Sequence, residues 1–573
     1  MFARVCSKPS TVARRRVAAA GLLGSTLALL GAGAVTAAPS GQRLTQPVQA
    51  TKGDVDPART YTSPSIAVDP ENPQNVVMAF VEARTRRCGL MRSTDGGDSW
   101  KVLDASPATA AFPVCFVISG RIDMAPVAFG RNHTLYYGLN GYDDTDGGVN
   151  NGNISVLVAR SDDMGDSWKT TVVHNTRPLQ PPNTDSARPV SDLAVDTSGK
   201  EDVVYVAWRS EYRTSVAPNL RPREPQVAVS TDGGKTFSDA VNVSAPAWAQ
   251  PENRAAALMT TTTLPGTPPP PAAPAGSKAA QPDQAGNFGG SNPSLTVDDK
   301  GNVYVAWITH SSNITPAPVP AVWLSKSTDH GKTYTASAIT PFQQGLSTFG
   351  SQRIRWSPKG GPNGTLHVVY EGTSDPNIAN NTDTYYQRST DGGKTWTQGK
   401  AINDDDPKQL AVQIAPNLSV APDGRVDVAW WDSRNDPGIR GNDVYYTSSS
   451  DNGSTWSKNT RITDQIVDRR IGIWANGYDV NVPPGIASTD KFLVVGWDDT
   501  RNGNQLTQTQ DLFTVDVQLQ RVGGGTSGAA KVALAAVGGV AVVGLVLLLV
   551  SLTNRRPAPS SPTGAREAPS LVR

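Results

Sequence analysis

Residues 389–396 read "STDGGKTW", and this octapeptide recurs with small changes along the chain. All copies fit the pattern S-x-D-x-G-x-[ST]-aromatic, and they begin at Ser93, Ser161, Ser230, Ser327, Ser389 and Ser449. The aromatic residues that end the copies are separated by 68, 69, 97, 62 and 60 residues, and the long interval contains an insertion. A nearly constant period is the mark of a repeat fold.

Each copy predicts a tight turn with a structural role. The aspartate carboxylate can accept backbone N–H bonds across the turn, and the glycine takes a backbone conformation that is barred to other residues. The aromatic residue then packs between neighbouring sheets. We therefore interpret the turn aspartates as structural rather than catalytic: Asp95, Asp163, Asp232, Asp329, Asp391 and Asp451.

The fourth repeat shows four strands most clearly, as "NPSLTVDD", "NVYVAWI", "AVWLSKS" and "YTASAIT". Four antiparallel strands in about sixty residues make one propeller blade. Sequences like the second strand recur from "VVMAFVEAR" to "FLVVGWDDTRN", and the last unit lacks the Asp turn. We therefore predict an all-β propeller of four-stranded blades. Seven blades are favoured, six are the alternative, and the N-terminal segment is a candidate to complete the last blade.

The two ends of the chain predict an exported, anchored protein. Residues 1–38 combine a basic start with an apolar stretch and a small-residue exit, which is typical of a signal peptide; general secretion and twin-arginine export both stay open. Val532–Leu552 is free of charge and is followed by Arg555 and Arg556, which predicts a single transmembrane helix with an extracellular N-terminal ectodomain.

These features give the expected domain boundaries. They are a signal peptide at 1–38, an N-terminal segment at 39–57, the propeller at 58–520 with a Pro/Ala-rich insertion at 247–290, a Gly-rich linker at 521–531, the membrane helix at 532–552 and a cytoplasmic tail at 553–573. Cys88 and Cys115 remain after removal of the leader, and an oxidising compartment favours a disulfide between them over two free thiols. The net charge of +1 gives no electrostatic case for nucleic acid.

Alternating strand direction predicts which face carries a ligand site. The Asp turns and the turns between first and second strands share one face, so the ends of the second strands surround the opposite one. Arginines gather where second strands end or first strands begin, and the candidate ligand residues are Arg84, Arg188, Arg213, Arg353 and Arg434. The alternative is a solvated or mutually paired rim of charge.

The six turns resemble the Asp boxes, or BNR repeats, of the sialidase superfamily, and the resemblance covers residues 60–517. It implies a propeller and, in an active sialidase, three arginines that hold the carboxylate of the sugar, a tyrosine nucleophile with a glutamate, and an aspartate as acid and base. The matching candidates are Tyr478, Glu371 and Asp123. The Arg-Ile-Pro motif of the family is replaced by Ser63-Pro64-Ser65.

Two functions follow from these observations. The favoured one is a cell-surface propeller that binds an extracellular glycan, a glycoprotein or another protein partner. The alternative is an exo-α-sialidase-like hydrolase that releases a terminal acidic sugar. No cofactor is required for either function, and Asp144 and Asp146 in "DDTDGGVNNGN" are candidate calcium ligands.

Overall fold

The computed structural model consists of two units, Met1–Ser40 and Gly41–Arg573, and the fold below belongs to the second. The structure describes residues 42–110, 112, 114–115, 117–118, 121–122, 125–142, 154–175, 184–213, 223–249, 293–309, 321–340, 351–373, 382–409, 411–436, 440–473 and 482–519.

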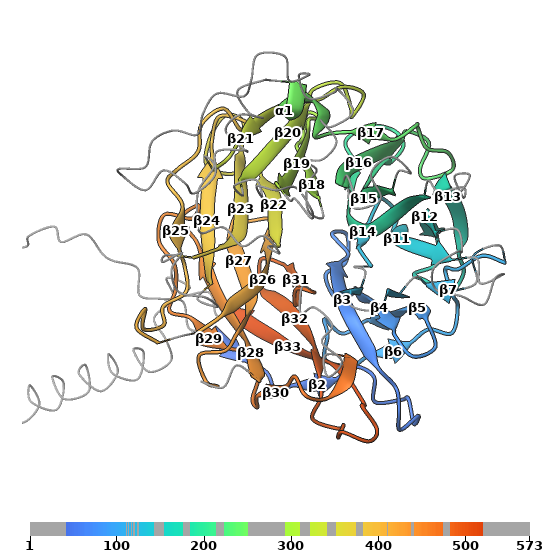
Figure 1. Ribbon diagram of the computed structural model, residues 1–573, viewed down its shortest axis with the longest axis vertical. Helices are drawn as coiled ribbons and strands as arrows, with labels where there is room; N and C mark the ends of the chain where they lie inside the picture. The colour runs from blue at the N-terminus through green and yellow to red at the C-terminus, as the bar shows by residue number, and fades with distance from the viewer. Residues whose placement is uncertain are drawn as a thin grey trace, which may run out of the picture. The chain divides into compact units, whose positions relative to one another are not determined.

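Seven antiparallel sheets of at least four strands stand around a common axis within the described part of the chain (Figure 1). Blade 1 contains β3 (Tyr61–Val68), β4 (Val76–Glu82), β5 (Arg87–Ser93) and β6 (Lys101–Val102). Blade 2 contains β10 (Val127–Phe129), β11 (Leu135–Tyr142), β12 (Ile154–Ser161) and β13 (Lys169–Asn175). Blade 3 contains β14 (Thr184–Asp196), β15 (Val203–Arg213), β16 (Arg223–Ser230) and β17 (Val241–Asn242).

The second half of the chain repeats the arrangement. Blade 4 contains β18 (Ser294–Val297), β19 (Val303–Ile308), β20 (Val322–Ser327) and β21 (Thr335–Ala338). Blade 5 contains β22 (Gln352–Ser357), β23 (Thr365–Gly372), β24 (Asp383–Ser389) and β25 (Lys400–Ala401). Blade 6 contains β26 (Gln413–Val420), β27 (Val426–Asp432), β28 (Gly441–Ser449) and β29 (Thr460–Arg461), with β30 (Val467–Asp468) paired to β28.

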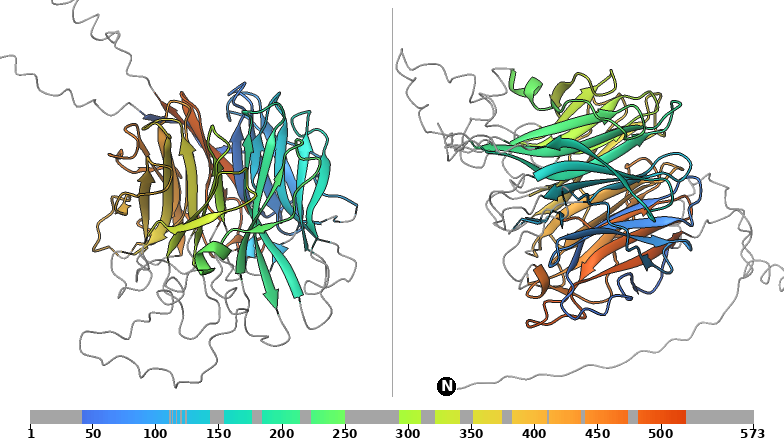
Figure 2. Two further views of the ribbon diagram at one scale, coloured as in Figure 1. Left: turned by 90° about the horizontal axis from the view of Figure 1, so that it is seen from above. Right: turned by 90° about the vertical axis from the view of Figure 1, so that its right-hand side faces the viewer.

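Blade 7 joins the two ends of the propeller. Its strands β31 (Gly485–Ser488), β32 (Phe492–Asp499) and β33 (Asp511–Leu519) are completed by β1 (Gln42–Leu44), which pairs antiparallel with β33, as does β2 (Val48–Gln49). The prediction of seven blades is confirmed, and the segment at 39–57 supplies the outer strand of the last one. Each first strand contacts the first strand of the next blade, from β3 round to β31 and back to β3 (Figures 1 and 2).

The hydrophobic core is divided into clusters that lie between neighbouring blades, and the described residues form seven of them. Trp208, Trp307, Trp430 and Trp497 are each completely buried and belong to four different clusters. Burial of one such side chain stabilises the fold by roughly 2–3 kcal/mol. The blades are therefore held together by side chains that alternate along the second and third strands.

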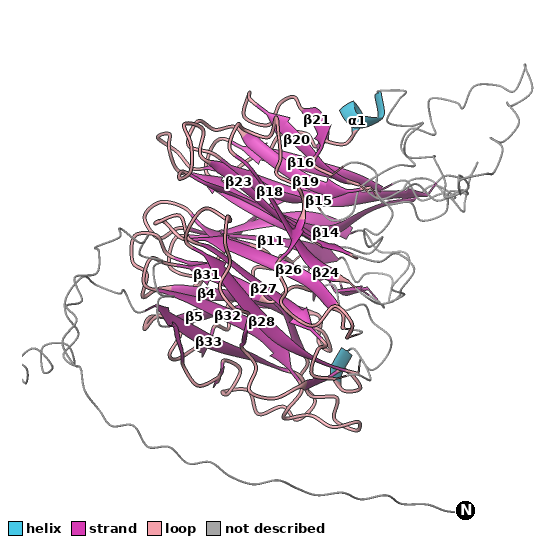
Figure 3. Ribbon diagram, turned by 90° about the vertical axis from the view of Figure 1, so that its left-hand side faces the viewer, coloured by secondary structure: helices cyan, strands magenta, loops and turns pink. Residues whose placement is uncertain are grey.

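One part of the predicted fold class needs correction. Within the described ranges, no helix has both the length and the apolar character needed to cross a bilayer. The one α-helix there is α1 (Ala245–Ala249), at the start of the insertion (Figure 3). The described part of the chain is accordingly an all-β propeller, and the transmembrane helix that we expected is not found there. Val532–Leu552, the signal peptide at 1–38 and most of the insertion lie outside the described residues.

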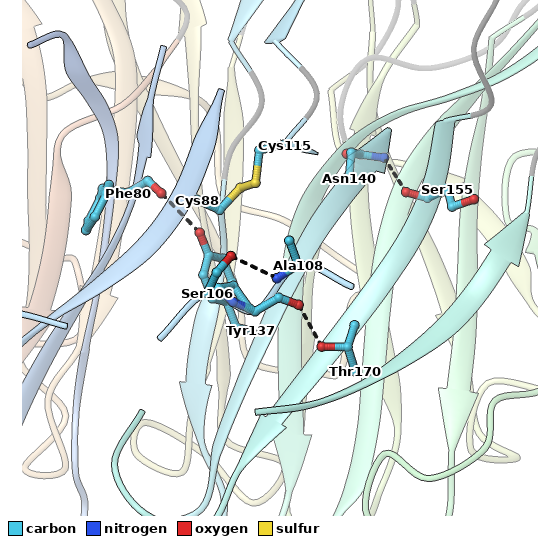
Figure 4. Close-up of a disulfide and its surroundings, with 10 residues drawn as sticks. Phe80, Cys88, Ser106, Ala108, Cys115, Tyr137, Asn140, Ser155 and Thr170 are labelled. Carbon is cyan, nitrogen blue, oxygen red and sulfur yellow. Dashed lines mark hydrogen bonds between the residues drawn. A yellow bond between two sulfur atoms is a disulfide. The ribbon is translucent and has the colours of Figure 1, made fainter. Parts of the chain in front are cut away.

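A disulfide joins blades 1 and 2 (Figure 4). Cys88 lies on β5, and Cys115 lies on β7 (Val114–Cys115), which pairs with β11 of the next blade. The backbone N–H of Cys115 also donates to the carbonyl of Arg86 at 2.8 Å. Close by, the Tyr137 hydroxyl of blade 2 donates to the carbonyl of Phe80 in blade 1 at 3.1 Å. The disulfide therefore cross-links blades 1 and 2 at an interface that a side-chain hydrogen bond also bridges.

Candidate functional site

Each Asp box closes its hydrogen bonds within its own turn. In the box of blade 5, Asp391 Oδ1 accepts from the Ser389 hydroxyl at 2.7 Å and from the Thr395 N–H at 3.0 Å, and Oδ2 accepts from the Thr395 hydroxyl at 2.6 Å. The N–H of Gly393 donates to Ser389 Oγ at 2.9 Å. The same four bonds recur in the other five boxes.

The electrostatics of the boxes match this geometry. Partial burial raises the pKa of Asp391, but hydrogen bonds from Thr395, Ser389 and Lys394 outweigh it and lower the pKa to about 2. The pKa of Asp232 is lowered to about 2 for the same reasons. A carboxylate that is ionised and fully engaged in a turn is a structural element. The residues therefore do in the fold what the sequence pattern indicates.

The aromatic residue that ends each box packs toward the preceding blade. Trp100 donates its indole N–H to Thr514 Oγ1 of blade 7 at 3.0 Å. Trp456 meets the Tyr386 ring of blade 5 edge-on, with ring centroids 4.8 Å apart. Trp396 packs on the cluster between blades 4 and 5. The boxes thus fasten one blade to the next on this face of the propeller.

The strand register separates the Asp boxes from the other face. In blade 1, Ser93 of the box and Val68 both pair with Val76, whereas Tyr61 pairs with Glu82 at the other end of the sheet. The starts of first strands and the ends of second strands therefore share the face opposite the boxes. This arrangement is the one expected from alternating strands.

A ring of polar side chains on the first strands narrows the centre of the propeller. Asp192 Oδ2 accepts from the N–H of Leu295 in blade 4 at 3.0 Å. Ser294 Oγ in turn accepts from the N–H of Ile354 in blade 5 at 3.2 Å. The Asn417 amide of blade 6 donates to the Pro484 carbonyl of blade 7 at 2.9 Å. Each of these side chains satisfies a backbone group of the next blade, so the ring is part of the scaffold.

An ion pair crosses this ring. Arg355 Nη1 of blade 5 lies 2.8 Å from Asp192 Oδ2 of blade 3, and Nη2 donates to Oδ1 at 3.3 Å. Cavities lie along the axis on both sides of the pair, and both are lined by Asp192, Arg355 and Asn417. The chamber toward the Asp boxes has a volume of about 870 Å³ with open solvent included, and its lining includes Ile66, Phe129 and Leu193.

The cavity on the opposite side of the ion pair, which we call the axial cavity, has a volume of about 380 Å³. Its polar lining comes from Ser63, Ser65, Ser191, Asp192, Arg353, Arg355 and Asn417. This volume includes open solvent. Binding pockets for small molecules combine a few polar groups with an apolar wall, as this cavity does. The apolar wall includes prolines from three first-strand regions, at Pro64, Pro126 and Pro483.

Arg353 lines the axial cavity, and its pKa is shifted by burial. It is 3% exposed, and its Nη1 donates to the carbonyl of Gln352 at 2.8 Å. Burial lowers the pKa of Arg353 to about 10, with an opposing effect from Asp192 and a further lowering from Arg355. The guanidinium is therefore charged at neutral pH in a place where charge is poorly solvated. An anion in the cavity would relieve that cost.

Glu371 lies close to this region but is held by the scaffold. It sits on β23, is 1% exposed, and its Oε1 accepts from the N–H of Ala415 in blade 6 at 2.5 Å. Its charge also raises the pKa of Arg353. It does not line the axial cavity. The structure thus brings Glu371 and Arg353 of the predicted residues into one neighbourhood.

Arg434 belongs to a hydrogen-bonded clamp at the end of β27. Its Nη2 lies 2.8 Å from Asp432 Oδ2, its Nη1 lies 2.7 Å from Asp404 Oδ1, and the guanidinium sits 4.2 Å above the Tyr445 ring. Burial lowers the pKa of Arg434, but the bond to Asp432 and the nearby carboxylates outweigh it, so the pKa stays above its usual value.

Blade 7 contains the same clamp as blade 6. There Arg501 binds Asp499 at 2.7 Å and Asp464 at 2.7 Å and lies 4.1 Å from the Phe513 ring. In both blades a tryptophan two residues before the aspartate donates its indole N–H to it, at 2.9 Å for Trp430 and 2.8 Å for Trp497. The pattern W-x-D-x-R therefore fixes the loop after the second strand.

The other predicted arginines lie away from the axial cavity or have side chains that the structure does not describe. Arg84 pairs with Asp56 beside blade 1, and Glu82 holds the same loop by accepting from the N–H of Thr85 at 2.7 Å. Arg188 and Arg213 stand on the paired strands β14 and β15, and the structure describes their backbone alone. Tyr478, Asp123, Asp144 and Asp146 lie outside the described residues. The described part of the chain contains no cluster of His, Cys, Asp or Glu suited to a metal ion.

Our sequence reasoning missed Ser191, Asp192 and Asn417 as lining residues. A signal for such residues was present, because several first strands carry a proline followed by a small polar residue and Leu or Ile. The examples are Pro64-Ser65-Ile66, Pro293-Ser294-Leu295 and Pro416-Asn417-Leu418. In a propeller, one position of each first strand meets the axis, so this pattern marks the ring that borders the cavity.

Comparison with protein families supports the fold. The BNR repeat-like domain family matches residues 280–475, which span blades 4, 5 and 6. The resemblance to BNR propellers is confirmed. Comparison with curated protein sequences found no match.

Several solved structures resemble the chain at low sequence identity. A protein of unknown function from Dyadobacter fermentans is 12% identical, with 84% of this chain and 99% of that one covered and a TM-score of 0.42. An α-L-arabinofuranosidase of Fusarium graminearum is 12% identical, with coverage of 71% and 98% and a TM-score of 0.39. The endosialidase of phage phi92 is 11% identical, with coverage of 84% and 69% and a TM-score of 0.38. We base no argument about chemistry on these similarities.

Proposed function

We propose that the propeller binds the terminal acidic sugar of an extracellular glycan in its axial cavity, without cleaving it. The observation that carries this proposal is Arg353, a buried guanidinium that lines a cavity of about 380 Å³. A carboxylate is the ligand group that best matches a guanidinium, because two parallel hydrogen bonds add to the charge attraction.

The rest of the lining suits a sugar. Hydroxyl groups from Ser63 and Ser65 and the amide of Asn417 surround the cavity, whereas the Ser191 hydroxyl is occupied by the Pro293 carbonyl. These neutral groups can exchange hydrogen bonds with the hydroxyls of a pyranose ring, and the prolines supply flat apolar surface. Asp192 is paired with Arg355, so its charge is already balanced. The net effect is a polar cavity in which the Arg353 guanidinium lies beside neutral hydrogen-bonding groups.

Binding is favoured over hydrolysis by the state of the carboxylates. A retaining glycosidase needs a nucleophile and an acid on either side of the scissile bond. Glu371 is 1% exposed and accepts from the Ala415 N–H, and Asp192 is paired, so neither carboxylate is free to act on a sugar in the cavity. An exo-α-sialidase-like hydrolase is the second candidate, and it would depend on Tyr478 and Asp123.

An extracellular site of action is part of the proposal. The disulfide between Cys88 and Cys115 supports it, because such bonds form and persist in oxidising compartments. Immunoblotting of the extracellular fraction from the native host tests this part. Recovery of the protein from the cytosol alone would contradict it.

A glycan array followed by titration tests the binding function. The purified protein is expected to bind glycans that end in an acidic sugar and to ignore their neutral counterparts. A fluorogenic sialoside assay on the same preparation separates the two candidate functions. Binding without turnover supports our proposal, whereas turnover that is lost in Tyr478→Phe or Asp123→Asn would replace it with the hydrolase. A folded protein that binds no acidic glycan would refute both.

A further inference from the structure

The start of β3 contains an unusual corner at the edge of the axial cavity. The pairing of β3 with β4 shifts register between Thr62 and Ser65, which marks a bulge. Ser63 has a φ of 59°, although it is not a glycine and Pro64 follows it. A residue before proline normally has an extended backbone, and positive φ is uncommon for any side chain other than glycine. Such corners persist where the surrounding structure holds them.

Blade 6 contains the same corner without the hydroxyl. The pairing of β26 with β27 shifts register between Ile414 and Asn417. There Ala415 has a φ of 51° and precedes Pro416. The alanine shows that this backbone conformation forms without a side-chain oxygen. The hydroxyl of Ser63 is therefore not needed to build its corner.

The hydroxyl of Ser63 is buried and has no hydrogen-bond partner among the described residues. Ser63 is 2% exposed, and it lines the axial cavity together with Arg353. A buried hydroxyl without a partner destabilises the fold, and native proteins rarely keep one without a reason. Ser191 gives the contrast. It lines the same cavity, but its hydroxyl donates to the Pro293 carbonyl at 2.7 Å.

We propose that the Ser63 hydroxyl is a ligand contact of the axial cavity. It exchanges a hydrogen bond with a hydroxyl or amide group of the sugar whose carboxylate binds Arg353. This inference rests on the proposed function and adds a second recognition point to it. The ligand class is then an acidic monosaccharide that presents a neutral polar group beside its carboxylate.

The corner in blade 6 shows which substitution of Ser63 the backbone tolerates. Ser63→Ala copies Ala415, so the variant is expected to fold. Removal of an unpaired hydroxyl should leave the melting temperature unchanged or raise it. Ser191→Ala is the matched control, because it removes a hydroxyl from the same cavity that does have a partner. It should lower the melting temperature and leave ligand affinity within about twofold of the wild-type value.

The experiment titrates the full protein and its variants with two probes, N-acetylneuraminic acid and methyl β-D-glucuronide, by calorimetry. Ser63→Ala is expected to weaken binding of at least one probe about tenfold, the usual effect of one lost hydrogen bond to a ligand. Ser63→Gly removes the same hydroxyl, and glycine adopts a positive φ without strain. This variant therefore gives a second measurement of what the hydroxyl contributes to ligand affinity.

The outcomes separate this inference from the function on which it rests. If Arg353→Ala weakens binding while both Ser63 variants bind as the wild type does, the proposed function stands and the role of Ser63 is refuted. A clear fall in melting temperature for Ser63→Ala with unchanged affinity would also refute it, because the hydroxyl would then be structural. If the folded wild type binds neither probe, the inference falls together with the proposed function.

Discussion

The two faces of the propeller differ in how their polar groups are satisfied. On the Asp-box face, Asp391 receives all its hydrogen bonds from its own turn, and the other boxes repeat this arrangement. On the opposite face, Arg353 is buried beside a cavity, and the Ser63 hydroxyl has no partner among the described residues. The Asp-box groups close their bonds locally and build the fold, whereas the groups that line the axial cavity form the ligand site that we propose.

Asp516 is an exception on the Asp-box face, and it lies where the propeller closes. In blades 1, 2, 4 and 5, the residue before the box serine is a cation that donates to a carbonyl in the next box. The examples are Arg92 to Met164, Arg160 to Gly233, Lys326 to Gly392 and Arg388 to Asn452. Asp516 of blade 7 instead lies against the second glycine of the next box, Gly97, a place that Leu90 and Leu324 take beside Gly165 and Gly393, and its Oδ1 is buried with no hydrogen-bond partner in the described structure.

The largest expected effect comes from this closing interface. Burial raises the pKa of Asp516 to about 7, and the nearby Asp98 and Asp95 raise it further. Because the folded state holds this proton more tightly than the unfolded chain, the contribution to stability is full below about pH 4 and is lost as the pH rises through 7. Asp516→Asn should therefore be as stable as the wild type at pH 3 and up to about 4 kcal/mol more stable at pH 8.

Chemical denaturation at several pH values measures this difference directly. Asp490→Asn, which removes a partly exposed carboxylate elsewhere in blade 7 and keeps an oxygen for the Asp423 N–H, is the control and should follow the wild type. Equal stability of wild type and Asp516→Asn at pH 8 would show that the carboxylate is better solvated than the geometry indicates.

The next largest effect concerns the aromatic residues of the boxes. Trp396→Ala should lower the free energy of unfolding by about 3 kcal/mol, because it empties the contact with the cluster between blades 4 and 5. Binding of an acidic glycan should be unchanged, because the residue lies on the other face. A variant with an unchanged melting temperature but lost binding would reverse our assignment of the two faces.

A smaller effect is expected from the box carboxylate itself. Asp391→Ala removes the acceptor of bonds from Ser389 and Thr395 and should cost about 1–2 kcal/mol, since water can replace part of these bonds. The lowered pKa of Asp391 means that its contribution is present above about pH 4 and is lost as the pH falls toward 2. Urea titrations at pH 7 and pH 3 test both statements, and a larger penalty at pH 3 than at pH 7 would contradict them.

The smallest effect belongs to the cations that join successive blades. Arg160→Ala should cost about 0.5–1 kcal/mol, because its bond to the Gly233 carbonyl at 2.9 Å lies near solvent. Arg160→Lys should recover part of this loss. A loss above about 2 kcal/mol in a urea titration would mean that these contacts hold the blades together more strongly than the hydrophobic clusters suggest.

Local patterns made the fold predictable. The Asp box contains its own donors, acceptor and turn glycine, so its geometry follows from eight consecutive residues. Alternation of apolar residues identified strands such as β19, and the period between boxes set their grouping into blades. The last blade was harder to assign, because β33 pairs with β1 across almost the entire chain. Patterns among neighbouring residues cannot indicate that two strands so far apart in the sequence pair with each other.

The candidate site was less predictable because several blades build it. Asp192 and Arg355 are 163 residues apart in sequence, yet they form one ion pair at the axis. Arg434 and Arg353 look alike in sequence, but Asp432 and Asp404 neutralise the first, whereas the second faces a cavity. Which arginine is available to a ligand depends on partners from distant strands. Sequence patterns could name the candidates but could not rank them.

The most direct test of the account is a titration of wild type, Arg353→Ala, Arg353→Lys and Asp391→Ala with an acidic monosaccharide such as N-acetylneuraminic acid. We expect Arg353→Ala to lose about 2–4 kcal/mol of binding free energy, or roughly 30- to 1000-fold in Kd, because the carboxylate loses a buried charged partner. Arg353→Lys should recover part of the loss, since it keeps the charge without the paired geometry. Asp391→Ala should bind as the wild type does. Equal affinity of wild type and Arg353→Ala would contradict the account.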